Sequence, residues 1–332
     1  MSWGALAARA RGLTTHLRTA AAAPTLAALP LQTIADELVA SGALPAGTAA
    51  DAVTMDIAAT RVAARRMATL ARWGVVTDAP IDALVGALEL DMIRILLRGA
   101  ASLAPASWRL ATLVPTPTLP RRLLERAARL ERPEQVLALL VASGHFAGAP
   151  AVAAWQASQA SQARATTAAL CATEHALAVA WGARFASARA RRAADAPLRA
   201  WLEDEAWLRT LWSVLAVSAA HLSSSEIDAL LTPVPGAEQP PIDLRRVAHD
   251  GEEAIHAVLA PLAARHIGLT AALAATAGNA EHAARDAQRQ YYAAWARRAP
   301  LSSAPVIHAV LAIAAECAAI RRLAFSHAGP SS

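Results

Sequence analysis

Acidic residues and arginines recur in one spacing at three places in this chain. In each copy an acidic residue stands five positions before an arginine, Ile or Leu precedes that arginine, and Leu follows it two positions later. The pairs are Glu89 with Arg94, Asp204 with Arg209, and Glu316 with Arg321. Carboxylate and guanidinium groups form ion pairs, and the planar guanidinium suits partners at buried or interface positions. This acid–arginine signature therefore predicts contact between helices rather than turnover of a substrate.

Helix geometry directs the two charges of each copy toward different neighbours. Residues five apart on an α-helix point about 140° apart, as follows from 3.6 residues per turn. The acid and the arginine of one copy therefore meet different parts of the protein. We expect them to form pairs between modules or to cap the carbonyl groups of loops.

Other candidate reactive groups do not combine into a known catalytic or metal site. The chain has no lysine, which excludes the Gly-x-x-x-x-Gly-Lys-Ser/Thr phosphate loop. Glu253 and His256 have the Glu-x-x-His spacing of di-iron bundles, but those sites use the motif twice with two further Glu, so a surface helix pair is favoured. Cys171 and Cys317 have no recognisable histidine partner motif, which favours buried thiols over nucleophiles. We predict no catalytic, cofactor-binding or metal-binding residues.

The elements that must position the signature residues are helices. Ala is the commonest residue and Leu and Arg follow, and all three lose little side-chain freedom in a helix. Residues typical of strands are sparse, with two Tyr and three Phe in 332 residues. That length is enough for two or three domains with buried cores. The composition predicts an all-α protein.

The high apolar content does not predict a membrane-spanning helix. Much of the 55% hydrophobic fraction is Ala, and a spanning helix needs about 20 apolar residues. The best candidate, residues 299–315, contains Pro300 and Pro305 and runs into Glu316. The first residues lack a compact apolar segment, so we expect no signal peptide there. The two widely separated cysteines suit a reducing cytoplasm and no disulfide.

The charge and the tryptophans each leave two interpretations open. A net charge of +5, carried by Arg, allows an anionic partner such as a membrane face or an acidic protein, without demanding nucleic acid. The densest basic run is either a solvated helix face or a surface toward anionic headgroups. Trp201 and Trp212 share one helix face, as core residues or as interface anchors. The run consists of Arg184, Arg189, Arg191, Arg192 and Arg199.

Repetition extends beyond the signature itself. The signature acids are 115 residues apart between the first and second copies and 112 between the second and third. After each of the first two copies come a Pro-rich stretch, a similar basic tail and a short predicted helix, whereas the third copy ends the chain. Repeats at a fixed period indicate that one helical unit was duplicated. We predict three similar helical modules, 1–115, 116–230 and 231–332.

The signature resembles that of a known family, the C subunit of prokaryotic V-type (archaeal-type) ATP synthases, which is related to the eukaryotic subunit d. The family signature reads acid, aliphatic, any, Asn, aliphatic, basic, any, Leu, Leu, basic, Gly, basic. Residues 89–99 match it through Arg98 and Gly99. Residues 3–13 also resemble the family's first helix, and residues 305–321 its last. Three positions depart from the signature. The Asn is replaced by Met92, Trp207 and Ala319, the basic residue that precedes Gly is replaced by Ser213 and Phe325 in the second and third copies, and the last basic residue is replaced by Ala100 in the first.

The resemblance implies three modules in a pseudo-threefold arrangement that forms a cup or funnel. It also implies a non-catalytic central-stalk subunit, bound peripherally to the cytoplasmic face of the cell membrane on the rotor ring of proteolipid subunits. The cup receives the central axle and transmits torque that couples proton or sodium translocation to ATP synthesis or hydrolysis. No cofactor, small-molecule substrate or nucleic acid is implied. The interface candidates, between modules or toward ring or axle, are Glu89, Arg94, Arg98, Asp204, Arg209, Glu316 and Arg321.

Two other functions compete with this interpretation. An all-α metal-dependent or prenyl-transfer enzyme would need carboxylate clusters such as Asp-Asp-x-x-Asp, and the sequence contains none. A free-standing all-α scaffold or adaptor protein without ATPase association would share the composition and the helices. Association with ATPase subunits separates that alternative from the rotor subunit.

Overall fold

A computed structural model describes residues 3–17, 19–77, 81–111, 113–159, 165–190, 195–220, 234–237, 252–276 and 279–327. Throughout these ranges the regular secondary structure is helical, and the only pairing of β type is an isolated bridge between Pro235 and Ala237. The prediction of an all-α protein is confirmed.

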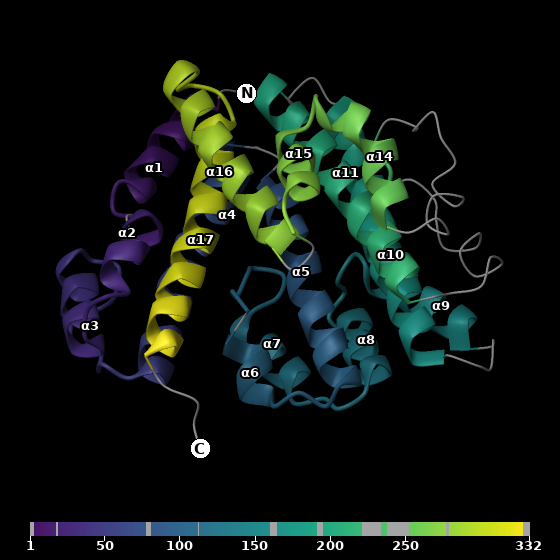
Figure 1. The fold of residues 1–332 in the computed structure, drawn as a ribbon, viewed down its shortest axis with the longest axis horizontal. Helices are drawn as coiled ribbons and strands as arrows, with labels where there is room; N and C mark the ends of the chain where they lie inside the picture. The colour runs from purple at the N-terminus through teal and green to yellow at the C-terminus, as the bar shows by residue number, and fades with distance from the viewer. Residues whose placement is uncertain are drawn as a thin grey trace. The chain divides into compact units, whose positions relative to one another are not determined.

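The helices are drawn in chain order in Figure 1. Their bounds are α1 Gly4–Thr14, α2 Thr19–Leu26, α3 Leu31–Ala40, α4 Ala52–Thr77, α5 Ile81–Ala101, α6 Ala106–Ala111, α7 Arg121–Ala128, α8 Pro133–Ala142, α9 Gly148–Gln159, α10 Ala165–Ala190, α11 Ala196–Ala219, α14 Glu252–Ala263, α15 Ile267–Ala274, α16 Ala280–Arg298 and α17 Ala304–Ser326.

The contacts within the chain divide it into two compact units. Unit 1 comprises residues 1–85, 105–126 and 292–332, and unit 2 comprises residues 86–104 and 127–291. This division does not test the repetition seen in the sequence. The three predicted modules therefore stay a prediction, with bounds 1–115, 116–230 and 231–332. The boundary near residue 230 lies outside the described residues.

Helix α17 forms the centre of unit 1, where it packs against α1, α2 and α4 (Figure 1). It is long and apolar enough to cross a membrane, with 23 residues and a mean hydropathy of 1.6, but 72% of its most apolar window is buried inside the protein. Pro305 does not interrupt it, because the helix begins at Ala304 and proline is tolerated in a first turn. Burial against three helices is typical of the core helix of a folded domain.

Helix α11 is the corresponding core helix of unit 2, with α10, α14 and α15 packed around it. Asp195 caps its start by accepting a hydrogen bond from the amide of Leu198 at 3.3 Å. Trp207 and Leu208 of α11 are fully buried beside apolar residues of α14 and α15. Trp201 is also buried, so it is a core residue rather than an interface anchor. Because most of α11 is buried among packed helices, the charged residues Asp204, Glu205 and Arg209 on it lie in a fixed environment with little water.

Candidate functional site

All three copies of the acid–arginine signature lie within long helices. The first is in α5, the second in α11 and the third in α17. Their acids, Glu89, Asp204 and Glu316, are each at most 3% exposed. Because a buried carboxylate is costly unless it is paired or hydrogen-bonded, each of these acids requires partners inside the protein.

Asp204 meets this requirement at the beginning of α15. Its carboxylate accepts hydrogen bonds from the amides of Gly268, at 2.9 and 3.1 Å, and Leu269, at 3.1 Å, and from the side-chain amide of Gln288 at 2.9 Å. The first amides of a helix lack partners within the helix and attract negative charge. Burial raises the pKa of Asp204, although these hydrogen bonds oppose that rise. The carboxylate therefore holds the start of α15 against α11.

Glu89 holds the start of a second short helix, α9, through a histidine. The Nε2 atom of His145 lies 3.4 Å from the Glu89 carboxylate, and its Nδ1 atom accepts a hydrogen bond from the amide of Ala147 at 3.3 Å. Since Nδ1 accepts, Nε2 carries the proton and donates it toward Glu89. In both copies, the signature acid therefore holds the start of a short helix that lies on the C-terminal side of a Pro-rich stretch, α9 in one case and α15 in the other.

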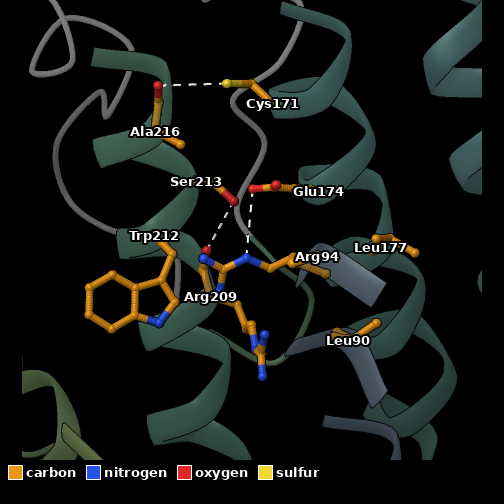
Figure 2. Close-up of a pocket in the computed structure, with 10 residues that line it drawn as sticks. Leu90, Arg94, Cys171, Glu174, Leu177, Arg209, Trp212, Ser213 and Ala216 are labelled. Atoms are coloured by element: carbon orange, nitrogen blue, oxygen red, sulfur yellow. Dashed lines mark hydrogen bonds and ion pairs between the residues drawn. The ribbon is translucent and has the colours of Figure 1, made fainter. Parts of the chain in front are cut away.

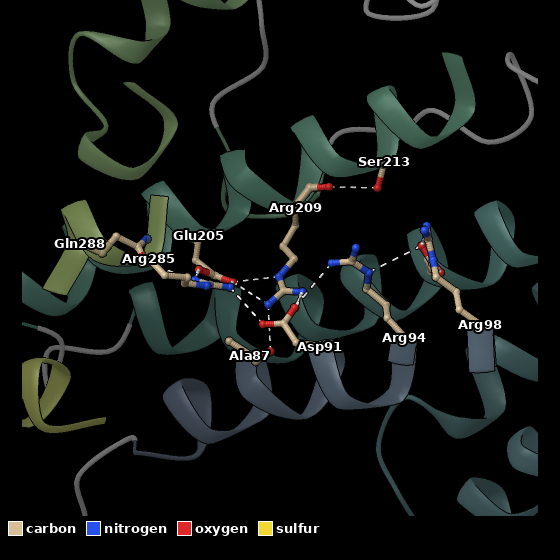
Figure 3. Close-up of polar contacts among 10 residues, drawn as sticks. Ala87, Asp91, Arg94, Arg98, Glu205, Arg209, Ser213, Arg285 and Gln288 are labelled. Carbon is tan, nitrogen blue, oxygen red and sulfur yellow. Dashed lines mark hydrogen bonds and ion pairs between the residues drawn. The ribbon is translucent and has the colours of Figure 1, made fainter. Parts of the chain in front are cut away.

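The arginine of the second copy belongs to a group of four charged side chains, Asp91, Glu205, Arg209 and Arg285, which we name the ionic cluster (Figure 3). Arg209 donates to Asp91 at 2.5 Å and to Glu205 at 2.8 Å. Arg285 bonds the same two acids, Asp91 at 3.2 Å and Glu205 at 2.9 Å. Each cation thus contacts both anions, and the cluster joins α5, α11 and α16 within unit 2.

The ionic cluster is balanced in charge and mostly removed from water. The side chains of Glu205 and Arg209 are buried, and those of Asp91 and Arg285 are partly exposed. Arg209 also donates to the backbone carbonyl of Ala87 at 2.9 Å, so it caps a carbonyl as well as pairing with acids. Such a cluster keeps three helices in one arrangement, because a shift of any helix would leave a buried charge without its partner.

The electrostatics of the cluster favour its ionised form. Burial by itself would raise the pKa of Asp91, but Arg209, Arg285 and Arg94 outweigh it and hold the pKa at about 2. The pKa of Glu205 is likewise lowered, because Arg285 and Arg209 overcome the effect of burial. Burial also acts against the charge of Arg209, yet Asp91 and Glu205 raise its pKa. All four groups are therefore charged at neutral pH.

The first-copy arginines extend this polar contact to α10. Arg98 binds both carboxylate oxygens of Glu174, at 2.6 and 2.7 Å. Arg94 lies 3.7 Å from Glu174 and 3.7 Å from Asp91, so it bridges Glu174 and the ionic cluster (Figures 2 and 3). Two signature arginines on one face of α5 therefore share one acid of α10.

A cavity of about 20 Å³ lies beside these residues (Figure 2). That volume is about the size needed for one water molecule and is too small for a substrate. Among its lining residues, Cys171 has its pKa raised to about 11 by burial, so its thiol stays protonated and unreactive at neutral pH. Burial also lowers the pKa of the nearby His175 to about 4, and its Nδ1 atom lies 3.1 Å from the hydroxyl of Ser213. This cavity has the character of a packing defect rather than a catalytic pocket.

The third copy lies in unit 1 and has different partners. Arg321 on α17 donates to the carboxylate of Asp56 on α4 at 2.7 Å. Glu316 on α17 faces a partly buried cation on α4, Arg66, whose pKa is lowered by burial, while the charge of Glu316 opposes that lowering. Both signature residues of this copy therefore act between α17 and α4.

The remaining sequence candidates are the Glu-x-x-His pair of α14 and the basic run. Glu253 is exposed and His256 half-buried on α14, and no group of three His, Cys, Asp or Glu side chains suited to a metal ion occurs in the described part of the chain. In the basic run, Arg184 lies over the ring of Phe146 at 5.1 Å. The side chains of Arg189, Arg191 and Arg192 lie outside the described residues.

Four residues that the sequence pattern did not single out supply the partners of the signature. Two of them could have been found from spacing, since Asp91 follows Glu89 by two positions and Glu205 precedes Arg209 by one helical turn. Glu174 and Arg285 lie on other helices, and no local pattern marks them. The four are Asp91, Glu174, Glu205 and Arg285.

Comparison with known proteins gives one family match. The model of the family described as ATP synthase (C/AC39) subunit matches residues 6–328 of this chain. No curated protein matches the chain. The match extends over the described parts of both units and includes all three signature helices, so the resemblance inferred from the signature is confirmed.

Proposed function

This chain belongs to the ATP synthase (C/AC39) subunit family, and from that premise we propose that it is the non-catalytic central-stalk subunit of a V/A-type ATPase. In this role it links the membrane rotor ring of proteolipid subunits to the central axle. It transmits torque that couples proton or sodium translocation to ATP synthesis or hydrolysis. The observation that carries the proposal is the family match over residues 6–328.

The contacts of the signature residues support a mechanical role. A part that transmits torque must resist deformation, and close-packed helices with charges locked between them are stiff. The ionic cluster ties α5, α11 and α16 together, and Arg321 ties α17 to α4. These charged groups are already occupied by one another, so they serve rigidity rather than chemistry on a ligand.

Co-purification from the native membrane tests the proposed assembly. A tagged copy of the chain should bring down an axle subunit and the proteolipid ring, with one copy of the chain per complex. Complexes stripped of the chain should hydrolyse ATP without pumping ions, and the purified chain should restore pumping. Recovery of the tagged chain as a monomer free of ATPase subunits would instead support the free-standing scaffold.

We further propose a peripheral location on the cytoplasmic face of the membrane. The burial of α17 within unit 1 favours surface attachment over insertion, because an inserted helix would have to leave its packing partners. An alkaline carbonate wash should therefore release the chain from membranes while the proteolipid ring stays in the pellet. Retention of the chain with the ring after this wash would contradict peripheral attachment.

A further inference from the structure

Unit 1 contains an open apolar groove of about 880 Å³, whose lining includes the Arg321–Asp56 pair of the third signature copy. Residues of α4, α6 and α7 line the groove, together with Arg321 and Phe325 of α17. The groove is more than forty times the volume of the cavity beside the ionic cluster. It is large enough to accept several side chains of a partner.

Large hydrophobic side chains are exposed in this groove. Val53, Ile57, Trp108 and Phe325 all line it, and their exposure ranges from 38% for Ile57 to 76% for Trp108. Single exposed apolar residues are common on protein surfaces, but a contiguous group marks an interaction site. Tryptophan is also the residue type most enriched among side chains that dominate binding energies. The four together form an apolar floor that is suited to a partner surface.

The charges at the groove are distributed unevenly. Arg321 pairs with Asp56 at 2.7 Å and Arg121 pairs with Glu125 at 2.5 Å, so these four charges cancel. Arg61 and Arg65 also line the groove, and their guanidinium groups contact no acid within the described residues. Because they are four positions apart on α4, they lie on the same face of that helix. The groove therefore has an unneutralised cationic edge of two arginines.

We propose that this groove binds an amphipathic helix of a partner protein, with the apolar face of that helix on Trp108, Ile57 and Val53 and its acidic residues opposite Arg61 and Arg65. From Val53 to Arg65 the wall of α4 is about 18 Å long, at 1.5 Å per residue, which matches about three turns of a bound helix. The open side of the groove leaves the polar face of such a helix in water. A lipid chain would instead require an enclosed apolar channel, which the exposure of Trp108 argues against. This docking site goes beyond the proposed rotor function and does not depend on it.

Fluorescence anisotropy with the purified full chain tests the site. The probe is a labelled helical peptide of about 18 residues with a leucine stripe flanked by glutamates, and its matched control carries lysine in place of every glutamate. The acidic peptide should bind at least about tenfold more tightly than the basic one, because only its charge complements the arginines. Hydrogen exchange should slow in α4 and α6 when the acidic peptide is bound. Equal binding of both peptides, or protection confined to other helices, would overturn the proposal.

Substitutions inside and outside the groove show which residues contribute to binding of the acidic peptide. The double variant Arg61→Glu, Arg65→Glu should weaken binding of the acidic peptide at least about tenfold. Arg72→Glu, an exposed arginine on α4 outside the groove, should change it less than about twofold. Trp108→Ala should weaken binding of the acidic peptide about thirtyfold. Leu301 has a similar exposure but lies outside the groove, so Leu301→Ala should leave the binding almost unchanged. Circular dichroism checks that each variant is folded.

Vesicles containing anionic phospholipid separate a lipid site from a peptide site. The chain should bind such vesicles no differently with and without the Arg61→Glu, Arg65→Glu substitutions. Two results together would refute the proposal: the substitutions abolish vesicle binding, and the acidic peptide does not bind the wild-type chain. The groove would then be a lipid site.

Discussion

Replacement of Arg209 by methionine should destabilise unit 2, because it removes a cation that contacts both acids of the ionic cluster. The guanidinium donates to Asp91 at 2.5 Å, to Glu205 at 2.8 Å and to the carbonyl of Ala87 at 2.9 Å. Methionine fills much of the same space but donates no hydrogen bond. After the substitution, Arg285 is the remaining cation that contacts both acids, and Asp91 also keeps Arg94 at 3.7 Å.

The size of the effect follows from these contacts. Removing one partner of a buried ion pair costs about 3–5 kcal/mol, chiefly because the other charge stays buried without compensation. Arg285 still contacts Asp91 and Glu205, and Asp91 keeps some access to water, so the cost belongs at the lower end of that range. We expect the free energy of unfolding to fall by roughly 3 kcal/mol.

Urea unfolding at neutral pH measures this loss, and hydrogen exchange in α11 assigns it to unit 2. Arg94→Met provides a matched control, since Arg94 also pairs with two acids, one of them Asp91, but at 3.7 Å and with a partly exposed side chain. Its loss should be about 0–1 kcal/mol, as for an exposed ion pair. If Arg209→Met costs no more than Arg94→Met, the ionic cluster does not hold the helices together and our reasoning about it is wrong.

Three further predictions concern the same regions. The pKa of Asp91 is held at about 2 against an ordinary 3.8, which corresponds to roughly 2 kcal/mol of stability that is present above pH 4 and lost as the pH falls toward 2. The difference in unfolding free energy between the wild type and Asp91→Asn, measured by urea titration, should therefore shrink over that pH range, and a constant difference would contradict the prediction. Gly268→Ala should destabilise the protein by about 1–3 kcal/mol, because the added Cβ would lie 2.7 Å from Asp204 Oδ2. Gly12→Ala in α1 has open space around the added Cβ and should stabilise the protein by up to about 1 kcal/mol. Thermal unfolding compares the two variants, and equal shifts of the unfolding temperature would refute the steric argument. Cys171 and Cys317 are buried with raised pKa values, so a thiol reagent at pH 7 should label them only after unfolding, and rapid labelling of the native chain would show them to be accessible.

The sequence predicted helical structure well and the partners of charged residues poorly. An excess of Ala, Leu and Arg determines helix locally, so the all-α class did not depend on knowledge of the tertiary arrangement. The argument against a membrane-spanning helix counted Pro305 as an interruption of the apolar segment, and that part of it was wrong. Proline interrupts a helix only beyond the first turn, and this helix starts at Ala304. The apolar stretch is in fact a buried core helix, and its burial depends on contacts that a hydropathy window does not contain.

In the candidate site, too, partners that are close in the sequence could be predicted and partners that are far apart in the sequence could not. Repetition and spacing singled out Arg209, and the preference of guanidinium for buried partners predicted its kind of contact. Its second acid, Glu205, is one turn away on the same helix and was within reach of local spacing. Arg285 is 76 residues further along the chain than Arg209, so only the packing of α16 in unit 2 brings it to the same carboxylates.

The three signature acids also show what the repeated pattern does and does not specify. Glu89 reaches the start of α9 through His145, and Asp204 bonds the first amides of α15 directly. Glu316 on α17 faces the cation Arg66 on α4 instead. What the three copies share is a buried carboxylate on a long core helix, while the group that compensates it differs each time. Because any compensating donor or cation satisfies a buried carboxylate, the repeat fixes the position of the charge and leaves its partner to the surrounding packing.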